Sequence, residues 1–76
     1  MNKKRRELLQ DAVGLLTRAS SIVTRALDDE QDCLDNMPEN LIDSERCHKM
    51  EDAIERLEEA VERIDDAKEC IDAASE

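Results

Sequence analysis

The side chains best suited to metal chemistry lie in the middle of the chain: Cys33, Met37, Cys47 and His48. If the chain reverses between the two cysteines, these groups come close together, and they are ligands that soft metals prefer. The spacing lacks the paired CxxC motif of structural zinc sites. Cys33 occupies an alanine position of a heptad row and Cys47 an apolar position, so the pattern favours small core residues. We therefore expect no metal, no cofactor and an exposed His48.

An acidic run follows the first third of the chain, with eight acidic and no basic residues between Asp28 and Glu45. The segment 28–32, DDEQD, has the composition of a calcium loop. An EF-hand requires glycine at the sixth position, where Cys33 stands, and the segment continues a helical pattern. Calcium binding is therefore disfavoured. A solvated acidic surface and an acidic docking surface both remain open.

Carboxylates are abundant, but no motif places any of them for catalysis. Catalysis requires a concave, partly dry pocket, which two helices of one chain do not form, so we predict no catalytic residue and no enzymatic activity. A polar cluster near the middle has two open interpretations: helix capping, or a recognition tip, because loops on rigid scaffolds often bind partners. Its members are Asn36, Glu39, Asn40, Ser44, Glu45 and Arg46.

The stretch 35–46, DNMPENLIDSER, predicts where the chain reverses. It contains the only proline, Pro38, which disfavours a helical conformation at the residue before it. Ser44 or Asp43 can cap a new helix. Because long helical patterns flank this stretch, we predict an antiparallel two-helix hairpin with helices at about 3–35 and 44–75 and a turn at about 36–43.

The composition supports the same fold class. The chain has 76 residues, no aromatic residue and 42% charged residues, which is typical of long helices with coiled-coil packing. Disorder is the alternative for so charged a chain, but ordered heptads disfavour it. We predict one all-α domain over residues 1–76 with an alanine-rich seam.

Apolar residues of the first predicted helix form a stripe roughly 140° wide, at about 100° per residue. This is wider than the seam between two helices requires. The residues at positions 14, 17, 20, 21 and 24 are small and flank the stripe. They form either a weakly polar exposed flank or a second packing face. The heptad rows are Leu8, Leu15 and Ile22; Leu9, Leu16 and Val23; and Ala12, Ala19, Ala26 and Cys33.

We favour the second packing face, because one partner helix leaves part of this stripe exposed to water. The chain is therefore predicted to form a homo-oligomer, most simply a dimer that builds a four-helix bundle with the first helix at its centre. The predicted oligomer interface consists of Leu8, Leu15, Thr17, Ser20, Val23 and Thr24.

The second predicted helix carries a heptad repeat with alanine at positions 53, 60, 67 and 74. If residue i faces residue 79 − i, Ala19 meets Ala60 and the alanine rows pack on each other. The centre of this register falls inside the predicted turn. The same register places the basic residues 3–6 near Asp72 and Glu76, at the negative end of the second helix.

The net charge of −10 disfavours direct binding of nucleic acid and favours solubility and basic partners. Three cysteines without a disulfide-framework spacing are typical of a reducing compartment, so we expect a cytoplasmic protein. The basic residues 3–6 precede a segment containing Glu7 and Asp11, which is neither a signal-peptide core nor a membrane span. We expect no membrane partner.

The turn DNMPENLIDSER and the following heptads, KMEDAIERLEEAVERIDDAKECI, resemble small helical-hairpin proteins of phages and prophages of Gram-positive bacteria. The sequence departs from that pattern at Cys47 and His48. The resemblance implies a phage accessory protein that binds or inhibits a host protein, with anti-defence as one such role. Two alternatives remain: an acidic nucleic-acid mimic that occupies a basic groove, and an oligomer that sequesters a small molecule.

Overall fold

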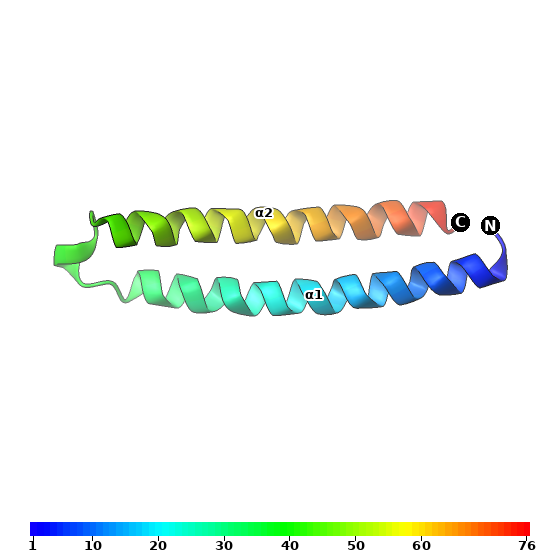
Figure 1. The fold of residues 1–76 in the computed structure, drawn as a ribbon, viewed down its shortest axis with the longest axis horizontal. Helices are drawn as coiled ribbons and strands as arrows, with labels where there is room; N and C mark the ends of the chain where they lie inside the picture. Colours follow the sequence, from blue (N-terminus) through cyan, green and yellow to red (C-terminus); the bar gives the residue numbers. More distant parts are fainter.

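The computed structural model describes all 76 residues, and it confirms an all-α hairpin. Helix α1 (Lys3–Asp35) and helix α2 (Glu45–Ala74) run antiparallel and side by side (Figure 1). A short 3-10 helix, η1 (Glu39–Leu41), lies between them. The chain forms a thin rod with extents of 59 × 15 × 12 Å. Neither helix is both long and apolar enough to cross a membrane.

Side chains cap both helices, and the cap of α2 is one of the two residues that the sequence predicts for it. The Asn2 side chain accepts a hydrogen bond from the Arg5 backbone N–H at 2.9 Å, which satisfies one of the free donors of the first turn of α1. The Ser44 side chain does the same for the Cys47 N–H at 3.2 Å. Because Ser44 is the cap, α2 begins at Glu45, one residue after the predicted start.

The turn is more ordered than a plain loop. At the end of α1, the Asn36 side-chain amide donates to the Asp32 carbonyl at 2.8 Å. Beyond Pro38, the Leu41 N–H donates to the Pro38 carbonyl at 2.8 Å, and the Ser44 N–H donates to the Leu41 carbonyl at 3.0 Å. These bonds form one turn of 3-10 helix before the chain enters α2.

The hairpin core is narrow and lies nearest the turn. Only Cys47, Met50 and Ile54 are buried, all in the first three turns of α2. No residue of α1 is buried. Ala12 and Ala19 of α1 are half-buried. The larger half-buried apolar residues of α1 recur at heptad spacing and define the face that packs on α2: Leu9, Val13, Leu16, Val23, Leu27 and Leu34.

The predicted register 79 − i is wrong at the open end of the hairpin. That register places Leu9 opposite Cys70 and Val13 opposite Asp66. In the structure, Leu9 and Val13 instead line a common recess with Asp72 and Ser75. The facing residues of α2 thus lie about one helical turn further along the chain than predicted. The alanine rows are therefore out of step with the predicted layers at this end.

The basic cluster, residues 3–6, is also placed differently from the prediction. The first turn of α1 extends past the end of α2 (Figure 1). All four side chains are exposed, and none forms an ion pair with Asp72 or Glu76. Every ion pair in the structure joins two residues of α2. The cluster is therefore a free basic surface.

Candidate functional site

Half of the predicted recognition tip makes polar contacts at the ends of the two helices. Asn36 and Ser44 form the helix caps described above. Glu45 forms an exposed ion pair with Lys49, one helical turn further on, at 3.5 Å. Such exposed pairs contribute little to stability. Asn36 and Ser44 therefore fit the capping interpretation of the cluster, whereas Glu45 pairs only with a neighbour on α2.

The other half of the tip is exposed and makes no polar side-chain contact. Glu39, Asn40 and Arg46 have neither a side-chain hydrogen bond nor an ion pair. Leu41 and Ile42 are exposed beside them. Leu41 and Ile42 were not predicted from the sequence, although two adjacent apolar residues between polar turn residues could have indicated an exposed apolar surface there. The tip offers an exposed surface but no convergent set of groups.

The cysteines do not form a shared site. Cys47 is buried, whereas Cys33 and Cys70 are exposed, and His48 is exposed as predicted. The Cys47 thiol donates to Glu51 Oε1 at 3.4 Å. Burial raises the pKa of this thiol, and the carboxylates of Glu51 and Asp43 raise it further. The structure contains no group of three or more His, Cys, Asp or Glu side chains suited to hold a metal ion.

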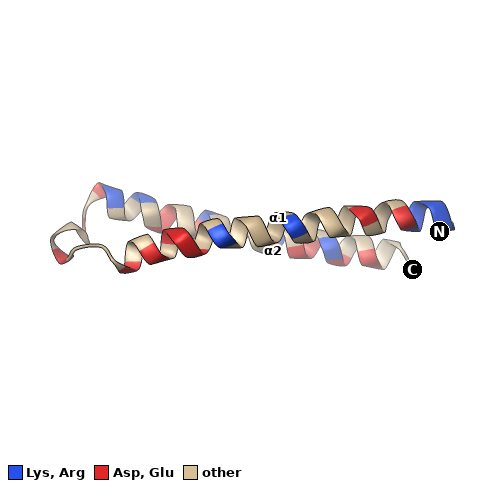
Figure 2. Cartoon of the chain, turned by 90° about the horizontal axis from the view of Figure 1, so that it is seen from below, with Lys and Arg blue, Asp and Glu red and all other residues tan.

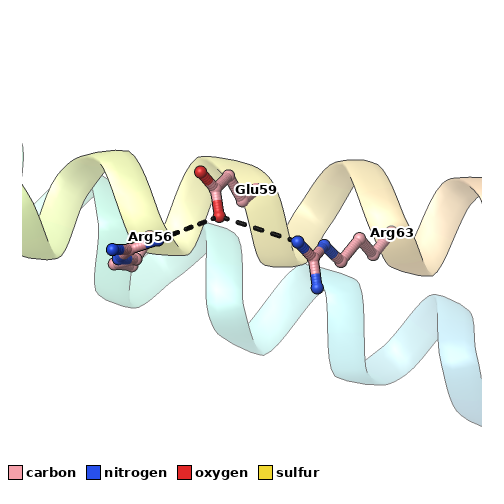
Figure 3. A network of polar contacts seen from close by, with 3 residues as sticks. All are labelled: Arg56, Glu59 and Arg63. Atoms are coloured by element: carbon pink, nitrogen blue, oxygen red, sulfur yellow. Dashed lines mark hydrogen bonds and ion pairs between the residues drawn. The ribbon is translucent and has the colours of Figure 1, made fainter.

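One carboxylate of α2 lies between two arginines. Glu59 Oε2 is 3.5 Å from Arg56 Nη1 and 4.0 Å from Arg63 Nη2 (Figure 3). Both arginine side chains are largely exposed. A carboxylate held in this way has its charge compensated, and solvent screens the pairs. The network therefore fits a charged outer surface of α2 better than an acid–base site.

The structure has one recess, which lies at the open end of the hairpin. It has a volume of about 160 Å³ and is lined by Leu9, Gln10, Val13, Asp72 and Ser75. Ligand pockets usually measure about 300–1,000 Å³ and have mainly apolar walls with a few placed polar groups. This recess is smaller, and only two of its five lining residues are hydrophobic. A single chain thus offers little space for a small molecule.

The strongest surface feature is a line of large apolar residues along α1. Leu8, Leu15 and Ile22 are 60%, 66% and 62% exposed. They are seven residues apart, so they lie in one row on a single face of the helix. We name these three residues the α1 apolar row. Helix α2 exposes no large hydrophobic residue at all.

The structure divides the predicted oligomer interface between different faces of α1. Leu8 and Leu15 belong to the exposed row. Val23, Ser20 and Thr24 are half-buried and lie on the side of the helix that packs on α2. The prediction that these three are free for a partner helix is therefore not supported by their position.

Thr17 lies on yet another side of α1. At about 100° per residue it is turned roughly 180° away from Leu8, and its hydroxyl donates to the Val13 carbonyl at 2.9 Å. Conversely, sequence reasoning omitted Ile22 from the interface. The signal for it was available, since Ile22 continues the heptad row of Leu8 and Leu15.

Charge is divided unequally along the chain. Residues 1–27 contain six basic and two acidic residues, whereas residues 28–76 contain five basic and nineteen acidic residues. Figure 2 shows the basic residues at the N-terminal end of α1 and the acidic residues of the same helix close to the turn. Helix α1 is thus electrically polar from one end to the other, with the apolar row between its two ends.

Two features of α1 are left unexplained by the packing of the hairpin: the exposed apolar row and the unpaired basic cluster at residues 3–6. Both lie on surfaces that α2 does not cover. Comparison with known proteins adds no assignment to this geometry, because no protein-family model, curated protein or solved structure matches the chain.

Proposed function

We propose that this chain is a non-enzymatic interaction protein whose docking surface is the α1 apolar row. The observation that carries the proposal is the exposure of Leu8, Leu15 and Ile22, in one line, on a helix whose adjacent face already packs on α2. Single exposed leucines are ordinary in proteins, but contiguous apolar surface is characteristic of interaction sites. The geometry of one straight row fits a helix as the docked element.

The free energy gained by covering the α1 apolar row depends on how much apolar surface the row exposes to water. Fully burying a Leu or Ile side chain contributes about 1.5–3 kcal/mol, and each of these residues is about two-thirds exposed. Covering the row with a partner helix therefore contributes on the order of 1–2 kcal/mol per residue. This gain offsets part of the free-energy cost of association and favours the binding of a partner helix to this face of α1.

Binding accounts for the other groups better than catalysis does. The raised pKa of Cys47 keeps this buried thiol protonated at neutral pH, and a thiol is a weaker nucleophile than a thiolate. Glu59 is already held by two arginines. The recess at the open end is small and lacks convergent titratable groups. None of these groups supplies the constellation that an active site needs.

A nucleic-acid mimic is the second candidate, because the acidic residues are numerous. Helix α2 carries eleven acidic and five basic residues over about 45 Å. Duplex DNA of that length carries about 26 negative charges, one for each ~1.7 Å. The net charge density of α2 is thus several times lower than that of DNA. This comparison favours docking through the apolar row over mimicry.

The turn and the acidic heptads supply the context for the proposal. Their resemblance to small proteins of phages and prophages supports a role in which the protein, once assembled, binds a host protein. The exposed tip around Glu39 and Asn40 and the acidic face of α2 are the surfaces available for such a target. A target with a basic surface would be complementary in charge to both the tip and the acidic face of α2.

Site-specific photo-crosslinking in living cells tests the proposed docking surface. A photoreactive amino acid replaces Leu15 in one variant and Glu62, which is exposed on α2, in a matched control variant. We expect the Leu15 position to crosslink to a protein with high yield and the Glu62 position to yield little. No crosslink at Leu15, or equal yields at both positions, would contradict the proposal.

A further inference from the structure

We infer that the helix docked on the α1 apolar row is α1 of a second copy of this chain, running antiparallel, with residue i opposite residue 34 − i of the partner. This inference rests on the proposed function and names the occupant of the same surface. Three observations carry it: the sizes of the apolar residues, the charges at the two ends of α1, and the free basic cluster.

In this register, each large side chain of the α1 apolar row meets a small side chain of the partner helix. Alanine stands four residues after each member of the row, at positions 12, 19 and 26, and therefore on nearly the same face of the helix. Ala26 is exposed, whereas Ala12 and Ala19 are half-buried between this face and the face that packs on α2. In the register 34 − i, Leu8 meets the partner's Ala26, and Leu15 meets the partner's Ala19. Ile22 likewise meets the partner's Ala12. Every layer then combines one large and one small residue, which allows the two helices to approach closely and interlock.

The opposite charges at the two ends of α1 favour a partner helix that runs antiparallel. The register that pairs large with small residues also places residues 3–6, KKRR, opposite residues 28–31, DDEQ, of the partner. Lys4 and Arg5 come next to the partner's Asp29 and the partner's Glu30. A parallel arrangement would instead bring each basic cluster against its own copy and each acidic cluster against its own copy. Like charges at such positions disfavour the wrong pairing.

The hairpin itself leaves the basic cluster available for this contact. Residues 3–6 extend past the end of α2 and form no ion pair within the chain. The register also has two unfavourable contacts, since Arg18 comes close to the partner's Arg18 and Glu7 comes close to the partner's Asp29. The same flank brings Asp11 close to the partner's Arg25. In a two-fold dimer the Arg18 contact occurs once and every other pair occurs twice, so the favourable pairs outnumber the unfavourable ones.

The resulting assembly is a rod of four helices with the two α1 helices at its centre. Residues 3–31 of both copies overlap along about 43 Å of helix. The α1 apolar row is covered over its whole length. Because the copies are antiparallel, the two turn tips lie at opposite ends of the rod, where each can contact a separate target.

Disulfide trapping between full-length chains tests both the occupant and the register. Cys33, Cys47 and Cys70 are first replaced by Ser, Ala and Ser, and retained helicity and melting temperature confirm that this background folds. Leu15→Cys and Ala19→Cys are then introduced in separate chains, and the two proteins are mixed in a glutathione redox buffer. Leu8→Cys with Ala26→Cys forms a second pair. Glu62→Cys, on the exposed side of α2, is the matched control.

The inference predicts that the mixed disulfide exceeds either homodisulfide by about tenfold in both pairs. In the 34 − i register the mixed positions face each other, whereas identical positions are offset by four residues for the Leu15 and Ala19 pair and by eighteen residues for the Leu8 and Ala26 pair, beyond the reach of a disulfide. Glu62→Cys should pair with none of them. The products are distinguished by mass, with an affinity tag on one chain of each pair.

Other outcomes overturn the inference in distinguishable ways. Dominant homodisulfides of Leu8→Cys and Leu15→Cys would indicate a parallel dimer. Statistical mixing, or no disulfide, would exclude the specific pairing. None of these results bears on the photo-crosslinking of Leu15, so a foreign protein captured there would retain the proposed function while the second copy is rejected.

Discussion

The two helices of the hairpin use their apolar residues differently. Helix α2 contains all three buried residues of the molecule and exposes no large hydrophobic side chain. Helix α1 has no buried residue and leaves Leu8, Leu15 and Ile22 in water. One apolar face is enough for α2 because it contacts only α1. Helix α1 has a second apolar face, which the hairpin leaves exposed and on which we propose that another helix packs.

This difference separates stability from assembly. The fully buried residues of the hairpin lie on α2 near the turn, whereas the large apolar residues that the hairpin leaves exposed lie on α1. Substitutions of the buried residues should therefore change the free energy of unfolding, and substitutions of the exposed row should change the affinity of the dimer.

Ile54→Ala should give the largest loss of hairpin stability. Ile54 is 7% exposed, so truncation removes buried methyl groups from the narrow core and should lower the free energy of unfolding by about 2–4 kcal/mol. Urea denaturation at low protein concentration measures it. Leu15→Ala is the matched comparison, and under these dilute conditions it should change the same quantity by less than about 0.5 kcal/mol. Equal losses would mean that the two helices do not divide the roles.

Charge reversal at the ends of α1 should have the next largest effect, this time on association. The first double variant is Lys4→Glu with Arg5→Glu, and the second is Asp29→Lys with Glu30→Lys. Each should weaken the homodimer about tenfold, because exposed ion pairs that stabilise it by about 0.2–1 kcal/mol each are replaced by repulsion between like charges. Mixing the two double variants should restore heterodimers, since both ends then carry opposite charges. Sedimentation velocity measures the affinities. Weakening without recovery in the mixture would contradict the antiparallel pairing.

Gly14→Ala should stabilise α1 without changing association. Apart from its chain neighbours and the nearby backbone of α1, no atom lies within 4 Å of the position that the added methyl group would occupy, and alanine in a helix interior is more favourable than glycine by about 0.5–1 kcal/mol. Thermal unfolding followed by circular dichroism checks the gain. A weaker dimer in this variant would instead show that the small residues around Gly14 form the packing face.

The Cys47 thiol should produce the smallest effect, a loss of stability at alkaline pH. Its pKa is raised in the folded chain above the ordinary value of 9.0, so near and above this pH the unfolded chain binds fewer protons than the folded one. The contribution of Cys47 to the free energy of unfolding is therefore fully present below about pH 9. It is lost as the pH rises through the pKa of the thiol in the folded chain. Comparing urea midpoints of the wild type and Cys47→Ala from pH 7 to 10.5 isolates this group. A pH dependence that survives in Cys47→Ala must have another origin.

Local chemistry made the helices predictable. Asn2 and Ser44 are caps because their side chains satisfy free backbone N–H groups, and heptad spacing determines which residues share a face. The register was not predictable in the same way. A shift by about one helical turn exchanges one apolar row for the next and keeps the same faces in contact. The 3-10 turn at Glu39–Leu41, which the sequence pattern did not indicate, changes how the chain enters α2.

The candidate site was predictable in part for a related reason. The wide stripe of α1 indicated a second partner, and Leu8 and Leu15 are indeed exposed. The sequence did not indicate which part of the stripe α2 occupies. Val23 and Thr24 were therefore assigned to the free face although they lie half-buried on the side of α2, and Ile22 was omitted. Only the packed structure separates two adjacent faces of one helix.

Sedimentation equilibrium of the wild type and of a Leu8→Gln, Leu15→Gln, Ile22→Gln variant shows whether a second copy of the chain covers the α1 apolar row. The account predicts that the wild-type mass rises from the 8.7 kDa of one chain to about twice that value across micromolar concentrations. The variant should remain at 8.7 kDa with unchanged helicity, because the substituted residues are exposed in the hairpin. A wild-type mass of 8.7 kDa at every concentration would contradict the claim that a second copy covers the α1 apolar row.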